Sequence, residues 1–484
     1  MTGLLLSAAL AAATDTLVVG TLSDPVGLEP HRATDLISLA IVANVCETLV
    51  RFPPGRSRPE AALATTWATA DQREWTFTLR EGVHFHDGAP LDAEAVVVNL
   101  EHLRRERGFP GRGERVGPYA VAITLDRSNA ALLSTLSQAF FALQSPRRLG
   151  NDEAPPVGTG PFRFRRARPG LVELEANEGY WGGSPRLRRV RFRRLPNQDA
   201  LIRALVTGEV DVTSALDQTR VAELRSHPEV TLDSQTGLSL VYLALNNERA
   251  PLDDRRVRQA LARGLDREAL TRDLLQGHGE PAHTPLPPSL WGHDTRSREL
   301  VLDRAAARRL LAQASMPGGF ATTVTVSAAP RPYLPDPLRV AARLREDLAQ
   351  IGVALTVRQA ASWREQVELT SSGEFDLALL GWQADTLDPN DFLTALLDSG
   401  SVGSTNRSRY RSPAMDALLK RARMGSDLDT RLAVYREVQD LFQKDMPFVP
   451  IYYGSVFTAH RRQVGGLVLG PTGIPRYDKA WKAP

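Results

Sequence analysis

The chain has 484 residues, two to three times the length of a typical single-core domain, so we expect more than one hydrophobic core. Its 42% hydrophobic and 24% charged residues are typical of a folded globular protein and exclude long disordered regions. Lys and Arg total 59 against 56 Asp and Glu, and no dense basic stretch occurs, so nucleic acid is excluded as a partner.

The N-terminus, MTGLLLSAALAAATDT, is an apolar stretch followed by an Ala-rich segment. This pattern predicts a signal peptide over residues 1–13, with cleavage near Ala13 and export of the mature chain. Because no Cys follows the apolar run, we expect a protein that is periplasmic or extracytoplasmic and not lipid-anchored. No later stretch is long enough to span a bilayer.

The mature chain is expected to begin with a strand at 16–20 and a mostly buried helix at 35–50. The loop between them, TLSDPVGLEPHR, contains Ser23, and loops after a first strand often face a cleft, so Ser23 is a candidate ligand contact. Cys46, the only cysteine, lies in the apolar run of the helix and is interpreted as a buried small hydrophobe. No internal disulfide is possible.

Residues 74–80 alternate apolar and polar side chains, which predicts a half-buried strand, and the helix over 91–105 is expected to be capped by Asp92. The later segments alternate between strand-like and helix-like patterns, which indicates an α/β fold whose second half has its own, mostly parallel sheet. Strands are predicted at 190–195, 210–216, 241–247, 322–327, 353–359, 375–382 and 448–460, and helices at 198–208, 253–264, 266–277, 303–314, 336–352, 362–373 and 430–445.

Four stretches of the chain carry a family resemblance. Residues 59–101 (PEAALATTWATADQREWTFTLREGVHFHDGAPLDAEAVVVNLE) resemble the signature region of the family-5 extracytoplasmic solute-binding proteins of peptide and nickel ABC importers. GTGPFRF (158–164), RALVTGEVDV (203–212) and the segment 242–270 stand at family-like positions. The resemblance covers nearly the whole mature chain.

The resemblance implies an α/β, two-lobed periplasmic binding protein fold of the Venus-flytrap type, with an extra subdomain in the N-terminal lobe. We expect the N-terminal lobe at 14–245, the C-terminal lobe at 246–454, and a return of 455–484 to the first lobe. Two crossing strands would act as the hinge around a buried ligand.

Residues 331–397 are most similar to the dipeptide-binding members. Asp385, in GWQADTLDPNDF, stands where these members hold the α-ammonium of the ligand, and Arg331, which opens RPYLPDP, stands where they hold its carboxylate. A free peptide is a zwitterion, so a desolvating cleft must supply one anion and one cation. Both residues follow a predicted strand, and Trp382 is expected to line the ligand site. The resemblance implies ligand roles for Asp385 and Arg331, and Trp382 and Ser23 are further candidates from their positions after predicted strands.

Each of these residues has a competing structural interpretation. The alternative role for Asp385 is to cap the next helix, which Asp388 or Asn390 would do equally well. Arg331 lies in a Pro-rich loop where a solvated Arg is ordinary, and a Trp at a strand end often belongs to the core. These alternatives stay open from the sequence.

Other residue clusters are weighed as metal or catalytic sites. His84 and His86 share one face of a presumed strand, but no third ligand is evident and the stretch belongs to the family signature, so we interpret them as structural. The acidic residues 385, 388 and 391 lack the Gly and Glu spacing of a calcium loop. No GxSxG, HExxH or Cys/His pairing occurs, so neither a cofactor nor an enzymatic activity is expected.

The sequence thus predicts the substrate-binding component of an ABC transporter that captures di- or other short peptides and delivers them to permease subunits, acting as a monomer. The alternative within this class is another small solute: glutathione, a metal chelate, haem or an oligosaccharide. A secreted hydrolase and a periplasmic chaperone are the rival classes. Multiple turnover of a peptide would favour the hydrolase, and a preference for long unstructured chains would favour the chaperone.

Overall fold

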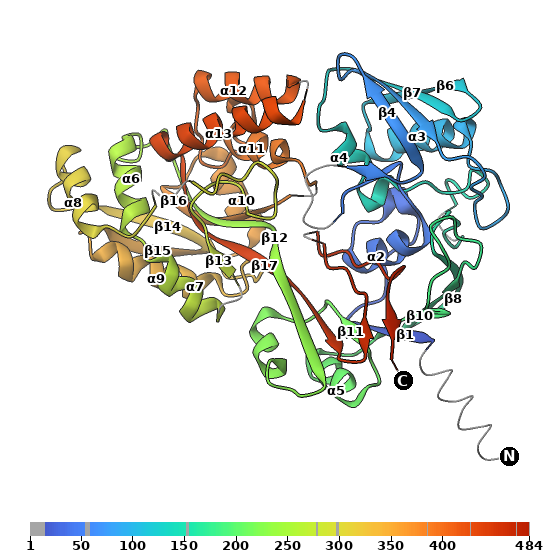
Figure 1. The fold of residues 1–484 in the computed structure, drawn as a ribbon. Coiled ribbons are helices and arrows are strands. Elements are labelled where there is room, and N and C mark those ends of the chain that lie inside the picture. The colour runs from blue at the N-terminus through green and yellow to red at the C-terminus, as the bar shows by residue number, and fades with distance from the viewer. Residues whose placement is uncertain are drawn as a thin grey trace. The chain divides into compact units, whose positions relative to one another are not determined.

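The structure is a computed structural model in which the chain divides into two compact units. Unit 1 comprises Met1–Gln235 and Val456–Pro484, and unit 2 comprises Thr236–Ser455. Helices and strands alternate in both units (Figure 1), which confirms the α/β class. The predicted signal peptide lies outside the described residues. The structure describes residues 15–53, 59–151, 154–276, 279–296, 300–384, 386–425, 427–470 and 472–483, and of residues 218, 219 and 222 it describes only the backbone.

Unit 1 is built around one edge of the large sheet. Its elements are β1 (Thr16–Thr21), α2 (Leu36–Val45), β8 (Phe162–Arg168), β9 (Leu171–Ala176), β10 (Arg189–Arg194), α5 (Gln198–Thr207), β11 (Val212–Thr213) and β17 (Phe448–Arg461). The strand order is β17-β11-β1-β10-β9-β8, and β1 lies parallel to both β10 and β11. Alternate residues of β1 and β10, such as Leu17 and Val190, are buried beside the apolar α2.

A second, smaller sheet in unit 1 has its own core. It consists of β4 (Ala64–Thr69), β5 (Glu74–Leu79), β7 (Ala120–Leu125) and β6 (Gly111–Gly117) in that order, covered by α3 (Ala93–Arg107). The predicted alternation holds, because Trp75, Phe77 and Leu79 are buried while the threonines between them are exposed. The side chain of Asp92 accepts a hydrogen bond from the Ala95 N–H, as predicted for the start of α3.

Two predicted elements of unit 1 are shorter than the sequence pattern suggests. The helix expected at 35–50 ends at Val45, and Val50 instead pairs with Ala61 in a short hairpin. The strand expected at 210–216 is reduced to β11. The remaining elements of unit 1 are η1 (Pro30–Arg32), β2 (Val50–Arg51), β3 (Glu60–Ala61), α4 (Leu132–Leu136), η2 (Ala139–Phe141), η3 (Gln218–Leu224), β18 (Val464–Gly465) and β19 (Trp481–Lys482).

Unit 2 contains the other edge of the large sheet. Its strands are β12 (Val230–Leu245), β13 (Gly279–Pro281), β14 (Ala321–Ser327), β15 (Ala354–Ala360) and β16 (Leu377–Gln383), together with the first half of β17. The order is β15-β14-β16-β12-β17, with β13 paired to β17. β14 is parallel to both β15 and β16, whereas β12 runs antiparallel to β16. The mostly parallel sheet predicted for the second half is therefore present in β14, β15 and β16, and β12 adds an antiparallel neighbour.

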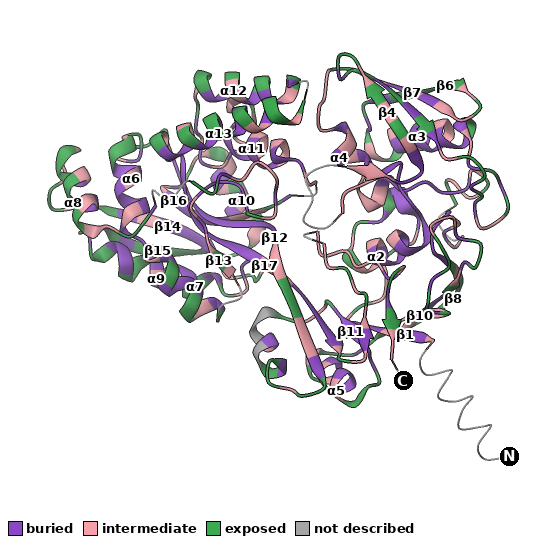
Figure 2. Cartoon of the chain, in the orientation of Figure 1, coloured by how far each residue is buried: buried purple, intermediate pink, exposed green. Residues whose placement is uncertain are grey.

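Helices surround the unit 2 sheet (Figure 1). Their exposed residues lie on outward faces, and the strands between them are largely buried, as Figure 2 shows. The helices are α6 (Arg255–Gly264), α7 (Arg267–Leu275), α8 (Arg304–Gln313), α9 (Pro337–Ala349), α10 (Trp363–Ser372), α11 (Pro389–Leu397), η4 (Ser399–Ser401), α12 (Pro413–Met424) and α13 (Leu428–Asp445).

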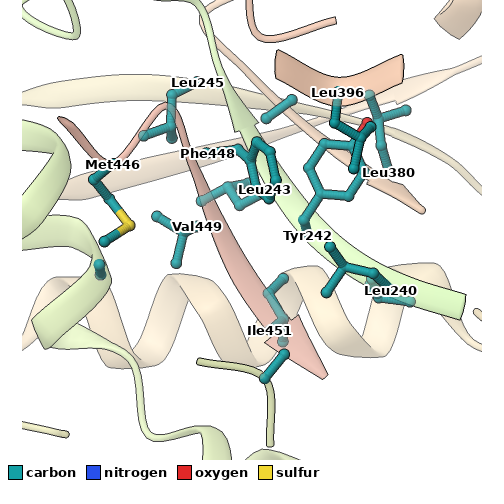
Figure 3. Packing of buried hydrophobic residues seen from close by; sticks show 14 of the residues in the cluster. Leu240, Tyr242, Leu243, Leu245, Leu380, Leu396, Met446, Phe448, Val449 and Ile451 are labelled. Carbon is teal, nitrogen blue, oxygen red and sulfur yellow. The ribbon is translucent and has the colours of Figure 1, made fainter. Parts of the chain in front are cut away.

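The core of unit 2 is centred on β12 and β17. Figure 3 shows residues of both strands packed together, with Tyr242 and Leu243 on β12 and Phe448 and Val449 on β17. The rings of Tyr242 and Phe448 have centroids 4.8 Å apart. Residues 238–245 of β12 and 448–453 of β17 are almost all apolar, which reflects burial on both faces of the sheet. This packing gives the neighbouring strands β14 and β16 a rigid support.

Candidate ligand-binding site

The predicted ligand residues of unit 2 follow two neighbouring strands. β14 and β16 are parallel and adjacent, with Thr325 opposite Ala378, so their carboxyl ends meet at one edge of the sheet. Arg331 comes four residues after the end of β14, and Trp382 is the last residue but one of β16. Ligands of α/β sheets bind beyond the carboxyl ends of strands. The adjacency that the sequence could only suggest is therefore present.

Arg331 is held in a tight turn. Its backbone N–H donates to the Leu334 carbonyl at 3.0 Å, and the Leu334 N–H donates back at 2.9 Å. The guanidinium lies over the ring of Trp363, 4.2 Å from the ring centroid, and its Nε is buried without a hydrogen-bond partner among the described residues. Stacking fixes the plane of the guanidinium and leaves donor N–H groups for another acceptor. Arg331 is thus an oriented cation rather than a solvated loop residue.

Trp382 lies at the end of β16, opposite Leu240 of β12. It packs against the unit 2 core while remaining partly exposed, and its Nε1 is buried with no partner in the part of the chain that the structure describes. Next to it, Gly381 allows close approach of an aromatic ring, because a Cβ there would lie 2.3 Å from the ring of Tyr333. Burial raises the pKa of the Tyr333 phenol. The aromatic rings of Trp382 and Tyr333 thus both lie at the end of β16.

Asp385 lies outside the described residues, but both of its flanks are anchored. The Ala384 N–H donates to the Leu238 carbonyl at 2.9 Å, and the Thr386 hydroxyl accepts a hydrogen bond from the Asp388 N–H at 3.2 Å. Asp388 is the N-cap of α11, accepting from the Asn390 N–H. The capping role that competed for Asp385 in the sequence is therefore filled by Asp388.

Asp388 also forms a buried ion pair that holds the start of α11. Arg431, in the first turn of α13, donates to its two carboxylate oxygens at 2.9 and 2.6 Å, and donates to the Tyr435 hydroxyl at 2.6 Å. Asp388 and Arg431 are 2% and 6% exposed. Burial alone would lower the pKa of Arg431, but the carboxylate raises it above its ordinary value. This ion pair thus ties the start of α11 to α13.

Ser23 lies in unit 1, two residues after β1. Its side chain is exposed, and its backbone carbonyl accepts a hydrogen bond from the Thr21 hydroxyl at 3.1 Å. Its role as a ligand contact stays a prediction.

The other clusters singled out in the sequence have structural roles. His84 and His86 do not lie on a strand: His84 makes an isolated bridge to Pro90, and His86 Nε2 bonds to the Gly160 carbonyl at 3.0 Å. Burial lowers the pKa of His86 to about 4. Cys46 is buried, as predicted, and burial raises the pKa of its thiol. Neither His joins a set of metal-ligand atoms within the described ranges.

A cavity of about 830 Å³ in unit 2 lies apart from these residues. It is lined by α7 and by parts of the segment 280–302, and neither Arg331 nor Trp382 is among its lining residues. Arg267, at this cavity, donates from Nε to the Pro450 carbonyl at 2.7 Å, so its guanidinium joins α7 to β17. Cavity size alone does not identify the ligand site.

Comparison with known proteins identifies the family. The model described as "Bacterial extracellular solute-binding proteins, family 5 Middle" matches residues 58–404. The chain belongs to this family. It is 30% identical to di/tripeptide-binding protein 2 of Pseudomonas aeruginosa, over 98% of this chain and 96% of that protein. It is 29% identical to heme-binding protein A of Haemophilus influenzae, over 96% of this chain and 91% of that protein.

Among solved structures, HbpA2 from Haemophilus parasuis has a TM-score of 0.92 and 28% identity, covering 97% of this chain and all of that chain. The fold is therefore the two-lobed periplasmic binding protein fold that the resemblance implied. Family-5 solute-binding proteins serve ABC importers in the periplasm or outside the cell, and the relatives named here are binding proteins rather than enzymes. In the described part of the chain, no helix is both long and apolar enough to cross a bilayer.

Three contributors to the site of this family-5 protein escaped the sequence reasoning. They are the Trp363 platform under Arg331, the Tyr333 ring over Gly381, and the Arg431 partner of Asp388. Ser362 is the N-cap of α10 and places Trp363 in the first turn of this helix. No local pattern indicated that this Trp would meet a loop some thirty residues earlier.

Proposed function

We propose that this family-5 solute-binding protein captures a free di- or tripeptide and delivers it to the permease of an ABC importer. The observation that carries the proposal is the stacked guanidinium of Arg331, which keeps an unpartnered Nε at the carboxyl edge of β14, beside the parallel strand β16 that leads to Asp385. In this assignment Arg331 binds the α-carboxylate and Asp385 binds the α-ammonium.

The charges of a zwitterion explain why both residues would be needed. A carboxylate removed from water requires a cation with good hydrogen-bond geometry, and a planar guanidinium supplies two parallel donors. An ammonium group likewise requires an acceptor, which a carboxylate two residues beyond β16 would provide. Trp382 and Tyr333 would exclude water from the peptide and contact its backbone or side chains.

Haem is the competing cargo, because heme-binding protein A is among the similar relatives. A porphyrin carries carboxylates but no ammonium group, so it would use Arg331 without needing Asp385. The two cargoes therefore predict different outcomes for substitutions at the two positions.

Isothermal titration with blocked peptides tests the proposal. We expect N-acetylation or C-amidation of a dipeptide to weaken binding by about 100-fold or more, since each leaves one buried protein charge unpaired. Asp385→Asn and Arg331→Met should each cause a similar loss. The exposed Asp429→Asn and Arg339→Met serve as matched controls and should leave the affinity unchanged.

The opposite results would contradict the peptide assignment. If acetylated and amidated peptides bind as well as the free one, the site does not recognise a zwitterion. If haem binds tightly and Asp385→Asn leaves that binding intact, the haem assignment replaces it. Multiple turnover of any peptide by the purified protein would contradict a pure binding role.

The proposal also includes export and a monomeric state. We infer that residues 1–13 are removed as a signal peptide and that the lobes extend over 14–245 with 455–484 and over 246–454. N-terminal sequencing of the exported protein and light scattering during size-exclusion chromatography test these two points.

A further inference from the structure

Unit 1 contains a buried cluster of metal-ligating side chains that the transport function does not use. Glu29 and His31 belong to the loop after β1, at η1, and His102 belongs to α3. The three residues are 3%, 1% and 4% exposed. One potential ligand atom from each lies within 4.8 Å of the other two. In the described part of the chain this is the one such group.

The hydrogen bonds of His31 fix the orientation of its ring. Its Nε2 lies 3.1 Å from the Ala142 carbonyl, which is an acceptor only, so Nε2 carries the proton and donates. The Nδ1 of the neutral ring therefore directs its lone pair inward, where His102 Nδ1 lies 2.9 Å away.

His102 meets His31 through the same ring atom. Its Nε2 lies 4.0 Å from a carboxylate oxygen of Glu106, and its Nδ1 meets His31. Two imidazole nitrogens at this separation must share a proton or a cation. The Glu29 carboxylate lies 4.0 Å from His31 Nδ1 and adds a negative charge in a nearly solvent-free position.

We propose that Glu29, His31 and His102 form a binding site for a divalent first-row transition metal ion, with zinc as the preferred ion. Two imidazole nitrogens and one carboxylate oxygen would supply three protein ligands for zinc, and a water would be the fourth ligand of a tetrahedral site. Ligand atoms around tetrahedral zinc are about 3.3 Å apart. The Nδ1 atoms of His31 and His102, which are 2.9 Å apart, would therefore move apart by about 0.4 Å. The Glu29 oxygen, which is 4.0 Å from His31 Nδ1, would move closer to both rings.

The surrounding groups fit this assignment. His31 Nε2 donates to a backbone carbonyl, and His102 Nε2 lies 4.0 Å from a carboxylate oxygen of Glu106. A backbone carbonyl and a carboxylate are the outer groups that metal-bound histidines usually face. Two cations also face the cluster. Arg32 is paired with Glu106 at 2.7 Å, and Arg107 donates to the backbone carbonyl of His31 at 2.7 Å while its guanidinium lies over Phe140.

The site would have a structural consequence for the first loop. Glu29 and His31 lie in the loop that begins next to Ser23, and His102 lies on the helix that covers the small sheet. A metal ion would therefore fix this loop to α3. The inference does not depend on which cargo the protein carries.

Zinc titration of the full-length protein after chelation tests the proposal. We expect one equivalent to bind with micromolar or tighter affinity and to raise the thermal unfolding midpoint. His31→Gln and His102→Gln should weaken binding by roughly 100-fold or more, since each removes a direct ligand. His84→Gln is the matched control, because His84 is exposed and lies in the same unit, and it should bind zinc as the parent does.

Crystals of the parent protein grown with one equivalent of zinc provide a second readout that needs no variant. We expect an anomalous peak at the zinc edge between Glu29, His31 and His102. Failure to bind zinc, an anomalous peak elsewhere, or unchanged binding in His102→Gln would overturn the proposal and would identify the pair of imidazoles as sharing a proton.

Discussion

The buried pair of Asp388 and Arg431 gives the strongest prediction of stability. Arg431→Met removes the guanidinium and leaves the Asp388 carboxylate 2% exposed, with only the Asn390 N–H and a hydroxyl at 3.4 Å as remaining partners. Breaking a buried ion pair in this way costs about 3–5 kcal/mol. For a unit of this size, that corresponds to a decrease of roughly 6–20 °C in the unfolding midpoint.

Urea denaturation followed by circular dichroism measures the effect, and a second ion pair that also involves α13 supplies the control. Arg421 and Glu437 form an ion pair at 2.9 Å, but their side chains are 56% and 48% exposed. Arg421→Met should therefore cost less than about 1 kcal/mol. Equal losses for Arg431→Met and Arg421→Met would refute the argument that burial sets the energy of this contact.

A double substitution separates charge burial from lost packing. In Asp388→Asn with Arg431→Met, the unpaired charge is gone, and the Asn side chain still provides an acceptor for the N-cap of α11. We expect this double variant to be more stable than Arg431→Met alone. Additive destabilisation would indicate that the two side chains contribute independently.

Three smaller predictions follow from single contacts. Gly381→Ala places a Cβ 2.3 Å from a tyrosine ring and should cost about 1–3 kcal/mol, whereas Gly27→Ala, which meets no atom within 4 Å, should change stability by less than about 0.5 kcal/mol in the same denaturation assay. Burial lowers the pKa of His86 from 6.5 to about 4, so the unfolded chain binds a proton in this window that the folded chain does not. Stability should then fall as the pH drops from about 6.5 to 4, by at most about 1.4 kcal/mol per unit, and His86→Gln but not the exposed His84→Gln should flatten the curve. The thiol of Cys46 is buried with a raised pKa and should react with Ellman's reagent only on unfolding; rapid reaction of the folded protein would contradict this.

Local patterns predicted the elements whose structure is decided locally. The alternation at 74–80 became β5 because one face of that strand is buried, and Asp92 caps the helix that its sequence position indicated. The family resemblance supplied the fold and the family. These features depend on neighbours in the sequence or on long matching stretches.

Features that depend on distant partners were not predictable in the same way. β12 begins eleven residues before the strand expected at 241–247. Its first half, which includes Asp233 and Gly237, is largely polar and shows no regular alternation of apolar residues that would indicate a strand. The direction of β12 relative to β16 is a property of the whole sheet. The platform of Trp363 under Arg331 likewise depends on the packing of α10 against the strand β14.

The zwitterion hypothesis is tested most directly by combining a change in the protein with a change in the ligand. C-amidation of a dipeptide and Arg331→Met each remove one partner of the same proposed contact, so titration calorimetry of all four combinations isolates their coupling. We expect amidation to weaken binding about 100-fold in the parent protein and hardly at all in Arg331→Met. An equal loss in both proteins would show that the carboxylate is bound elsewhere.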